Sequence, residues 1–262
     1  MLENNYKFFG FGLRSAQEVG KRAVCAWALL ERSSLEFEIE DFNDQGLILD
    51  AHASMNAWVV PTNISRLMTS SERSLFEKPL GTWTENDQCE AYVFHEALIV
   101  SLWALQKFDW LDKWEDPFSS EMYEAVCGEM MKPGKFLSGL SLRPLTELIR
   151  EFNHATWMLM LYHEECKFLK GDIAFDDCNR SINQIRSEYR GMHLDGSQLK
   201  EGENLLEHSF ANPHPAEVGR IMRMALTRHC VLGWILNQIA YWNPAGRYSE
   251  DSISPCPLIS NN

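Results

Sequence analysis

The sequence predicts an all-α protein, a single-domain helical bundle of about eight to ten helices. Three observations support this fold class. Apolar residues recur three and four positions apart through most of the chain, capping signatures precede several of these segments, and strand-like alternation is confined to one short segment. Because 45% of the 262 residues are hydrophobic, the chain can bury a sizeable core, and we expect one domain over residues 1–262.

Two segments in the first third of the chain begin with a capping box. Residues 15–32 start with Ser15 and Glu18 and continue with apolar residues at helical spacing, and residues 69–77 repeat the signature with Thr69 and Glu72. The second segment ends near Pro79, because proline disfavours helix at the residue before it. Both segments are therefore expected to be helices.

Residues 88–108 are apolar on nearly every side, which predicts a helix at the centre of the core. One earlier segment alternates instead, with Leu35, Phe37 and Ile39 against three glutamates. A lone strand cannot form a sheet, so we expect at most a minor β element near residues 35–40.

Residues 119–240 predict four more helices. Their expected ranges are 119–131, 144–171, 176–189 and 215–240. We expect the second and fourth of these to pack against the central helix. The glycine- and proline-containing stretch 192–214 is expected to be a flexible loop, and residues 246–262 a loosely packed tail.

The charge and the cysteines restrict the class of protein. A net charge of −13 repels phosphate, so neither nucleic acid nor an anionic membrane is expected as a partner. The acidic surface suits either a basic protein partner or solubility alone, and solubility is the more common role of such charge. The N-terminus lacks the pattern of a secretory signal, and charged residues interrupt the most apolar stretches, so we expect no membrane span. Seven cysteines without a C-x-x-C pair favour the reducing cytoplasm.

Five fragments occur in an order that resembles a known family. They are LRSAQEVGKRA (13–23), TSSERSLFE (69–77), EALIVSLWALQKFDWLDK (96–113), SLRPLTELI (141–149) and RHCVLGWIL (228–236). Over about residues 13–243 the chain resembles the domain of unknown function 4272 family, which has no assigned activity. The resemblance implies a mostly α-helical single domain. The chain departs from the family at Phe94 and Thr227, where the family usually has an arginine and a glutamate.

His95 and Glu96 lie inside an apolar run, FHEALIVSLWAL, and form either part of a catalytic site or a buried structural ion. Adjacent residues on a helix point about 100° apart, so the two cannot form a dyad by themselves. An unpaired buried carboxylate is very unfavourable. We therefore expect Glu96 to be ionised, buried and paired with a cation from another helix, with Arg228 the first choice and Arg22 the second.

Two spacings are typical of metal ligands, and neither is complete. Glu151 and His154 form an E-x-x-H motif, as in di-iron bundles, but the sequence has no second copy and the pair falls away from the apolar stripe of its helix. His163 and Cys166 lie one turn apart without a matching pair. We expect no metal and no cofactor. The sequence also has no nucleophile elbow, phosphate loop or H-E-x-x-H motif.

These observations favour a non-enzymatic cytoplasmic protein of the immunity or adaptor type, which binds another protein through acidic helix faces or through the 192–214 loop. The loop carries Glu201, Glu203 and Glu207. The alternative is a hydrolase-type enzyme that uses Glu96 with His95, Arg22 or Arg228. A pocket that reaches Glu96 would favour the enzyme, and enclosure of its carboxylate by side chains would favour the binding protein.

Overall fold

The computed structural model describes residues 12–41, 45–109, 128–189 and 215–242, together with the single residues 111, 126, 200 and 244. In this part of the chain all the regular elements are helices, which confirms the all-α fold class. They are α1 (Ala16–Asp41), α2 (Gln45–Val59), α3 (Ile64–Leu67), α4 (Ser70–Phe76), α5 (Glu85–Ala104), α7 (Pro133–Phe136), α8 (Leu145–Leu169), α9 (Phe175–Tyr189) and α11 (Pro215–Ile235). Of the described helices, none is both long and apolar enough to cross a membrane.

The strand-like segment near residues 35–40 belongs to a helix, because α1 continues without a break to Asp41. Helical geometry places its residues differently from a strand. Glu36 is buried and Phe37 is exposed, and Glu36 pairs with Arg32 one turn earlier. This i, i+4 spacing brings the two side chains together only in a helix, because residues four apart lie on one helical face.

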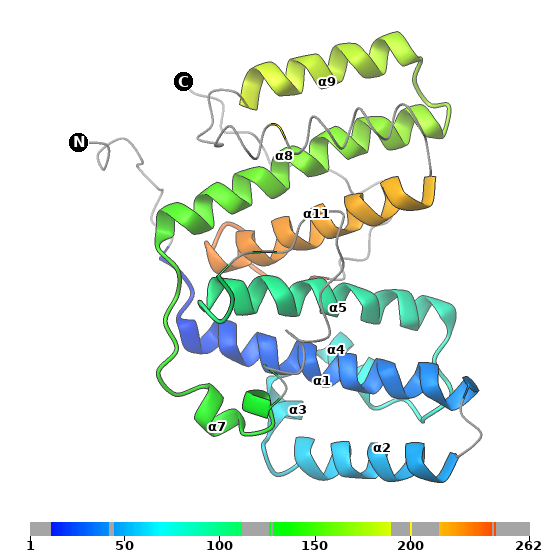
Figure 1. Ribbon diagram of the computed structural model, residues 1–262, viewed down its shortest axis with the longest axis vertical. Helices are drawn as coiled ribbons and strands as arrows, with labels where there is room; N and C mark the ends of the chain where they lie inside the picture. The colour runs from blue at the N-terminus through cyan, green and yellow to red at the C-terminus, as the bar shows by residue number, and fades with distance from the viewer. Residues whose placement is uncertain are drawn as a thin grey trace.

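Helix α2 has no counterpart among the helices predicted from the sequence. Its segment, QGLILDAHASMNAWV, has no capping signature, and its apolar residues surround the helix instead of forming one stripe. The helix packs antiparallel against α1 (Figure 1), where Trp27 and Trp58 meet edge to face with their ring centroids 4.7 Å apart.

Capping boxes start both α4 and α5. The predicted pair of Thr69 and Glu72 is confirmed at the start of α4. A second pair, Thr84 and Asp87, starts α5 three residues before the predicted position. As predicted, this helix is central: it lies between α1 on one side and α11 on the other (Figure 1).

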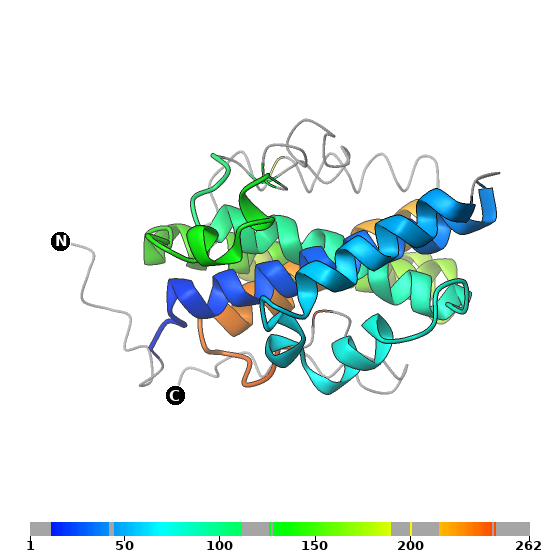
Figure 2. The same ribbon diagram turned by 90° about the horizontal axis from the view of Figure 1, so that it is seen from below.

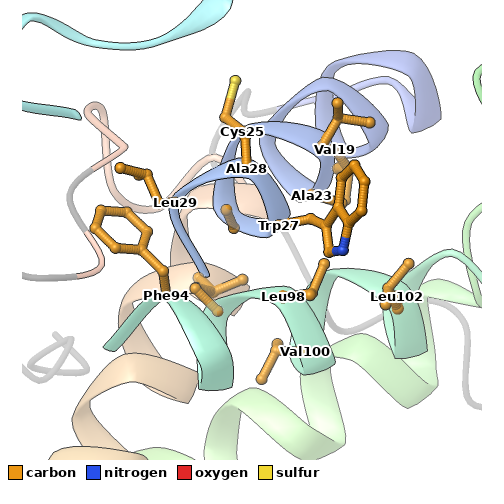
Figure 3. Close-up of a cluster of buried hydrophobic side chains, with 14 of the residues drawn as sticks. Val19, Ala23, Cys25, Trp27, Ala28, Leu29, Phe94, Leu98, Val100 and Leu102 are labelled. Atoms are coloured by element: carbon orange, nitrogen blue, oxygen red, sulfur yellow. The ribbon is translucent and has the colours of Figure 1, made fainter. Parts of the chain in front are cut away.

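The buried apolar side chains form two clusters. The larger one joins α1 and α5, whose facing side chains include Val19, Trp27, Leu98 and Leu102 (Figure 3). The smaller one joins α8, α9 and the first half of α11. Both α8 and α11 contribute side chains to both clusters, so these two helices connect them.

The predicted packing of the two long helices is correct for one of them. Helix α11 packs directly on α5, whereas α8 packs chiefly on α11, with α9 on its other side (Figures 1 and 2). Most of the helix predicted at 119–131, the 192–214 loop and the 246–262 tail lie outside the described residues.

Candidate functional site

The carboxylate of Glu96 forms a buried ion pair with Arg228. The Nε of Arg228 donates a hydrogen bond to Oε1 of Glu96 at 2.5 Å, and the two side chains are 2% and 9% exposed, respectively. Glu96 belongs to α5 and Arg228 to α11, so the pair connects two packed helices. The predicted first-choice partner of Glu96 is confirmed.

Glu151 and His154 join the same cluster from α8. Nη1 of Arg228 lies 3.8 Å from Oε1 of Glu151, and Nδ1 of His154 lies 3.7 Å from that same oxygen. The expectation that the E-x-x-H pair falls away from the apolar stripe is wrong, because His154 is buried and the Glu151 side chain is 12% exposed. The polar core of the bundle, defined as Glu96, Glu151, His154 and Arg228, therefore draws on three helices.

The electrostatics of this polar core keep Glu151 ionised. Burial by itself would raise the pKa of the Glu151 carboxyl group. The imidazole of His154 and the guanidinium groups of Arg228 and Arg150 outweigh that effect, so the pKa lies below its ordinary value. One arginine thus contacts two carboxylates, and the second carboxylate has a histidine beside it.

In the polar core, the guanidinium of Arg228 lies at the position that a metal ion between the two carboxylates would occupy. The guanidinium of Arg228 lies between the carboxylates of Glu96 and Glu151, the groups that a di-iron site would use. Among the residues that the structure describes, no group of three or more histidine, cysteine, aspartate or glutamate side chains is placed to hold a metal ion.

Arg22, the second-choice partner of Glu96, pairs with a different carboxylate. Its Nη1 lies 2.9 Å from Oε2 of Glu72, and Nε1 of Trp242 donates a hydrogen bond to the other oxygen of Glu72 at 2.8 Å. Glu72 also belongs to the capping box of α4, where its side chain accepts a hydrogen bond from the backbone N–H of Thr69, so one carboxylate joins α1, α4 and the segment after α11. Arg22 was one of three alternative partners of Glu96 in the hydrolase hypothesis, and in the structure its ion pair is with Glu72.

A third buried ion pair, Arg32 with Glu36, was not predicted. Both side chains are buried, and Glu36 also accepts hydrogen bonds from the backbone N–H groups of Gly81 and Trp83. The i, i+4 spacing of an arginine and a glutamate in one helix was a usable sequence signal for this pair. The pair was not predicted because residues 35–40 were interpreted as a possible strand, in which Arg32 and Glu36 would not be neighbours.

Two of the remaining candidates, His95 and Cys166, lie among packed helices, and so does the buried His229, which is not one of the predicted site residues. His95 is half-buried and adjoins Glu96 on α5. The Nδ1 of His229 is 2.8 Å from Oγ1 of Thr156, and burial lowers the pKa of His229 to about 4. The Sγ of Cys166 is 3.6 Å from Sδ of Met222. These contacts are the ones expected of core histidines and thiols.

The predicted partner-binding residues Glu201, Glu203 and Glu207 lie outside the described residues. Their role stays a prediction from the sequence.

A comparison with protein families matches residues 10–167 to the model described as Domain of unknown function (DUF4272). This match confirms the resemblance deduced from the five fragments, and the last fragment, at 228–236, lies beyond it. The matched residues contain Glu96 and Glu151, and Arg228 lies outside them. No curated protein and no solved structure matches the chain.

Proposed function

The chain belongs to the DUF4272 family, which is described only as a domain of unknown function. From the residues of this chain we propose that it is a non-enzymatic protein that binds a basic protein partner through its acidic surface. The observation that supports this best is the enclosure of the Glu96–Arg228 pair. A general base must reach the proton that it removes, and this carboxylate is occupied by a guanidinium inside the bundle.

Two other buried carboxylates support the same proposal. Glu72 and Glu36 are each paired with an arginine and accept further hydrogen bonds from a tryptophan side chain or from backbone N–H groups. Each group has a partner that accounts for its burial. Glu72 and Glu36 therefore have structural roles that account for their burial.

The charge of the chain supports the choice of partner. A net charge of −13 attracts a basic surface over several ångströms and speeds association with it. Such attraction acts between exposed charges, so it is screened beyond about 8–10 Å at physiological salt. Affinity for the partner should therefore fall as ionic strength rises.

The proposal is tested by capture of partners from the native organism at low salt, followed by elution with rising salt. Reversal of Glu201, Glu203 and Glu207 to lysine should weaken the capture. The control reverses the exposed residues Glu77, Asp109 and Asp172, which gives the same change in net charge at other positions of the chain. A specific basic protein that the first variant loses and the control retains would support the proposal.

The enzyme alternative has a distinct result. If nothing specific is captured, and the purified protein turns over a substrate in a hydrolase screen, the binding proposal fails. Loss of that turnover in Glu96→Gln, with the fold retained by circular dichroism, would assign the activity to Glu96.

A further inference from the structure

Two sulfur atoms meet where α8 packs on α11. The thiol of Cys166 on α8 lies against the thioether of Met222 on α11, with Sγ and Sδ 3.6 Å apart. Both side chains are half-buried, so solvent reaches the pair. The contact suits a core thiol, and it also has the geometry of two ligands of one metal ion. Two sulfur ligands about 2.3 Å from an ion, at an angle of about 100–110°, lie about 3.5–3.8 Å apart.

Helical geometry places a third ligand, His163, opposite Met222. Helices α8 and α11 are antiparallel (Figure 1), because the contact position on α11 falls from 229 to 222 as that on α8 rises from 156 to 166. Thr156 faces His229 across this contact, with Oγ1 and Nδ1 2.8 Å apart. Residues seven apart lie on one face of a helix, two turns further along. Two turns along both helices from that contact, His163 therefore faces Met222, one turn before Cys166.

The histidine and the cysteine are in protonation states that suit a metal ion. Burial lowers the pKa of His163, so its imidazole is neutral at neutral pH and a ring nitrogen can coordinate. Burial raises the pKa of Cys166, so the thiol keeps its proton until a metal displaces it. Binding would release this one proton to solvent and form a metal–thiolate bond, with no change in oxidation state.

We propose that His163, Cys166 and Met222 bind copper(I). Thiolate and thioether sulfur are soft ligands, and this combination favours copper(I), whereas structural zinc uses four ligands that do not include a thioether. One thiolate also neutralises a monovalent ion, so the half-buried site carries no net charge, whereas a divalent ion would leave one there. This site differs from the histidine, cysteine and carboxylate groups that the described residues do not form, because its third ligand is a methionine.

The third ligand is what the sequence did not supply. The spacing of His163 and Cys166 gives two ligands from one helix, and the expectation of no metal rested on the lack of a matching pair. The fold brings Met222 to them from a helix more than fifty residues away in the chain. This inference is independent of the proposed function.

Competition for copper(I) with the chelator bathocuproine disulfonate, in oxygen-free buffer, tests the inference. The wild type should hold one copper equivalent, and Met222→Leu should hold it more than about a hundredfold less tightly, because the loss of a ligand costs more than the loss of a supporting residue. Leucine keeps the apolar volume, so the fold is retained. Met131→Leu is the matched control, because it removes an exposed thioether and should leave the affinity unchanged.

The thiol is tested in the same way. Cys166→Ser should lose the copper equivalent, whereas Cys89→Ser, which removes an exposed thiol, should retain it. X-ray absorption at the copper edge identifies the ligands. The wild type should show two sulfur neighbours and one nitrogen neighbour, Met222→Leu should lose one sulfur, and His163→Phe should lose the nitrogen. A purely structural role of these residues would not change the neighbours of the copper ion. Circular dichroism of every variant checks the fold.

Two results would overturn the inference. One is a wild type that holds copper(I) no more tightly than Cys166→Ser does. The other is a bound copper ion whose neighbours are the same in the wild type, Met222→Leu and His163→Phe, because that ion would be held by other thiols of the chain.

Discussion

Three buried arginines each form an ion pair with a buried glutamate. They are Arg22, Arg32 and Arg228. A buried charge is tolerated when a counter-charge and hydrogen bonds replace the lost water. Two of the arginines also lie over tryptophan rings, Arg22 over Trp242 and Arg32 over Trp83. Such pairs contribute little net stability, but the loss of one partner leaves an uncompensated charge in the core.

Glu96→Gln should therefore lower the free energy of unfolding by about 3–5 kcal/mol, because Arg228 keeps its charge and loses its closest carboxylate. Urea denaturation at neutral pH measures the change. Glu129→Gln removes one partner of the exposed pair with Lys107 and should change the stability by less than about 1 kcal/mol. If the two substitutions lowered the free energy of unfolding equally, the loss of Glu96 would leave no uncompensated buried charge on Arg228, and the prediction would be wrong.

His229 should make the protein sensitive to mild acid. Burial lowers its pKa in the folded state from 6.5 to about 4, so the unfolded chain takes up a proton first as the pH falls. The stability that the neutral imidazole contributes is fully present above pH 6.5 and is lost progressively as the pH falls towards 4. Between pH 7 and pH 5 this loss amounts to about 2 kcal/mol.

His229→Phe removes the titrating group and keeps a ring against Phe152, on which His229 stacks with centroids 4.8 Å apart. Urea denaturation at pH 7 and pH 5 should show a smaller loss for this variant than for the wild type. Glu151, whose pKa is also lowered, contributes in the same direction at lower pH, below its ordinary value of 4.5. An unchanged loss in His229→Phe would assign the acid sensitivity to other groups.

At the scale of the element, α11 determines how the core is assembled. It contacts α5 and α8, supplies Arg228, and contributes apolar side chains to both clusters. Two of its glycines differ in surroundings. A Cβ on Gly233 would lie 2.7 Å from Cδ1 of Ile239 and 3.1 Å from Cε2 of Phe152, whereas a Cβ on Gly219 would meet nothing within 4 Å.

Alanine at these two positions should have opposite effects. Gly219→Ala should stabilise the protein by up to about 1 kcal/mol, because alanine has the higher helix propensity and the space is open. Gly233→Ala should destabilise it by about 1–3 kcal/mol through overpacking against α8 and the turn after α11. Thermal and urea unfolding of the two variants measure the difference, and stabilisation by both would mean that α8 and α11 are not closely packed there.

At the scale of the whole molecule, the sequence predicts the helices that carry a stripe or a cap. Pro144 and the long apolar stripe identify α8, and Thr69 with Glu72 identifies α4. Helix α2 was not predicted, because its existence depends on packing against α1 and not on a local signal. The alternation at residues 35–40 was misread as a strand. An alternation over only six residues is a weak signal, and the helical pattern that begins at Ala16 continues through it.

The polar core was predicted only in part, because part of it depends on how the helices are arranged in space. Burial of Glu96 follows from its apolar neighbours in the sequence, and the need for a cation follows from burial. Which arginine supplies it depends on helix order, and Arg228 is 132 residues away. The inclusion of Glu151 and His154 follows from the rotation of α8 about its axis, which a mixed polar and apolar helix does not define from sequence alone.

Thiol labelling should show whether the two apolar clusters unfold as one domain. Cys25 lies in the larger cluster and Cys178 in the smaller, and burial raises their pKa values to about 12 and about 11, so neither should react in the folded state. Cys89 is exposed and should react at once. Any slow reaction without urea requires local opening, and we expect it to be faster at Cys178 than at Cys25, because α9 is held chiefly by α8.

As urea is raised, the two labelling rates, read by mass spectrometry of peptides, should converge on the rate of global unfolding. The reason is that α8 and α11 each place side chains in both clusters, so neither cluster can lose its packing without exposing the other. A difference between Cys25 and Cys178 that persists through the unfolding transition would mean that the chain contains two independently unfolding units. Convergence would assign α1, α5, α8, α9 and α11 to one cooperative domain.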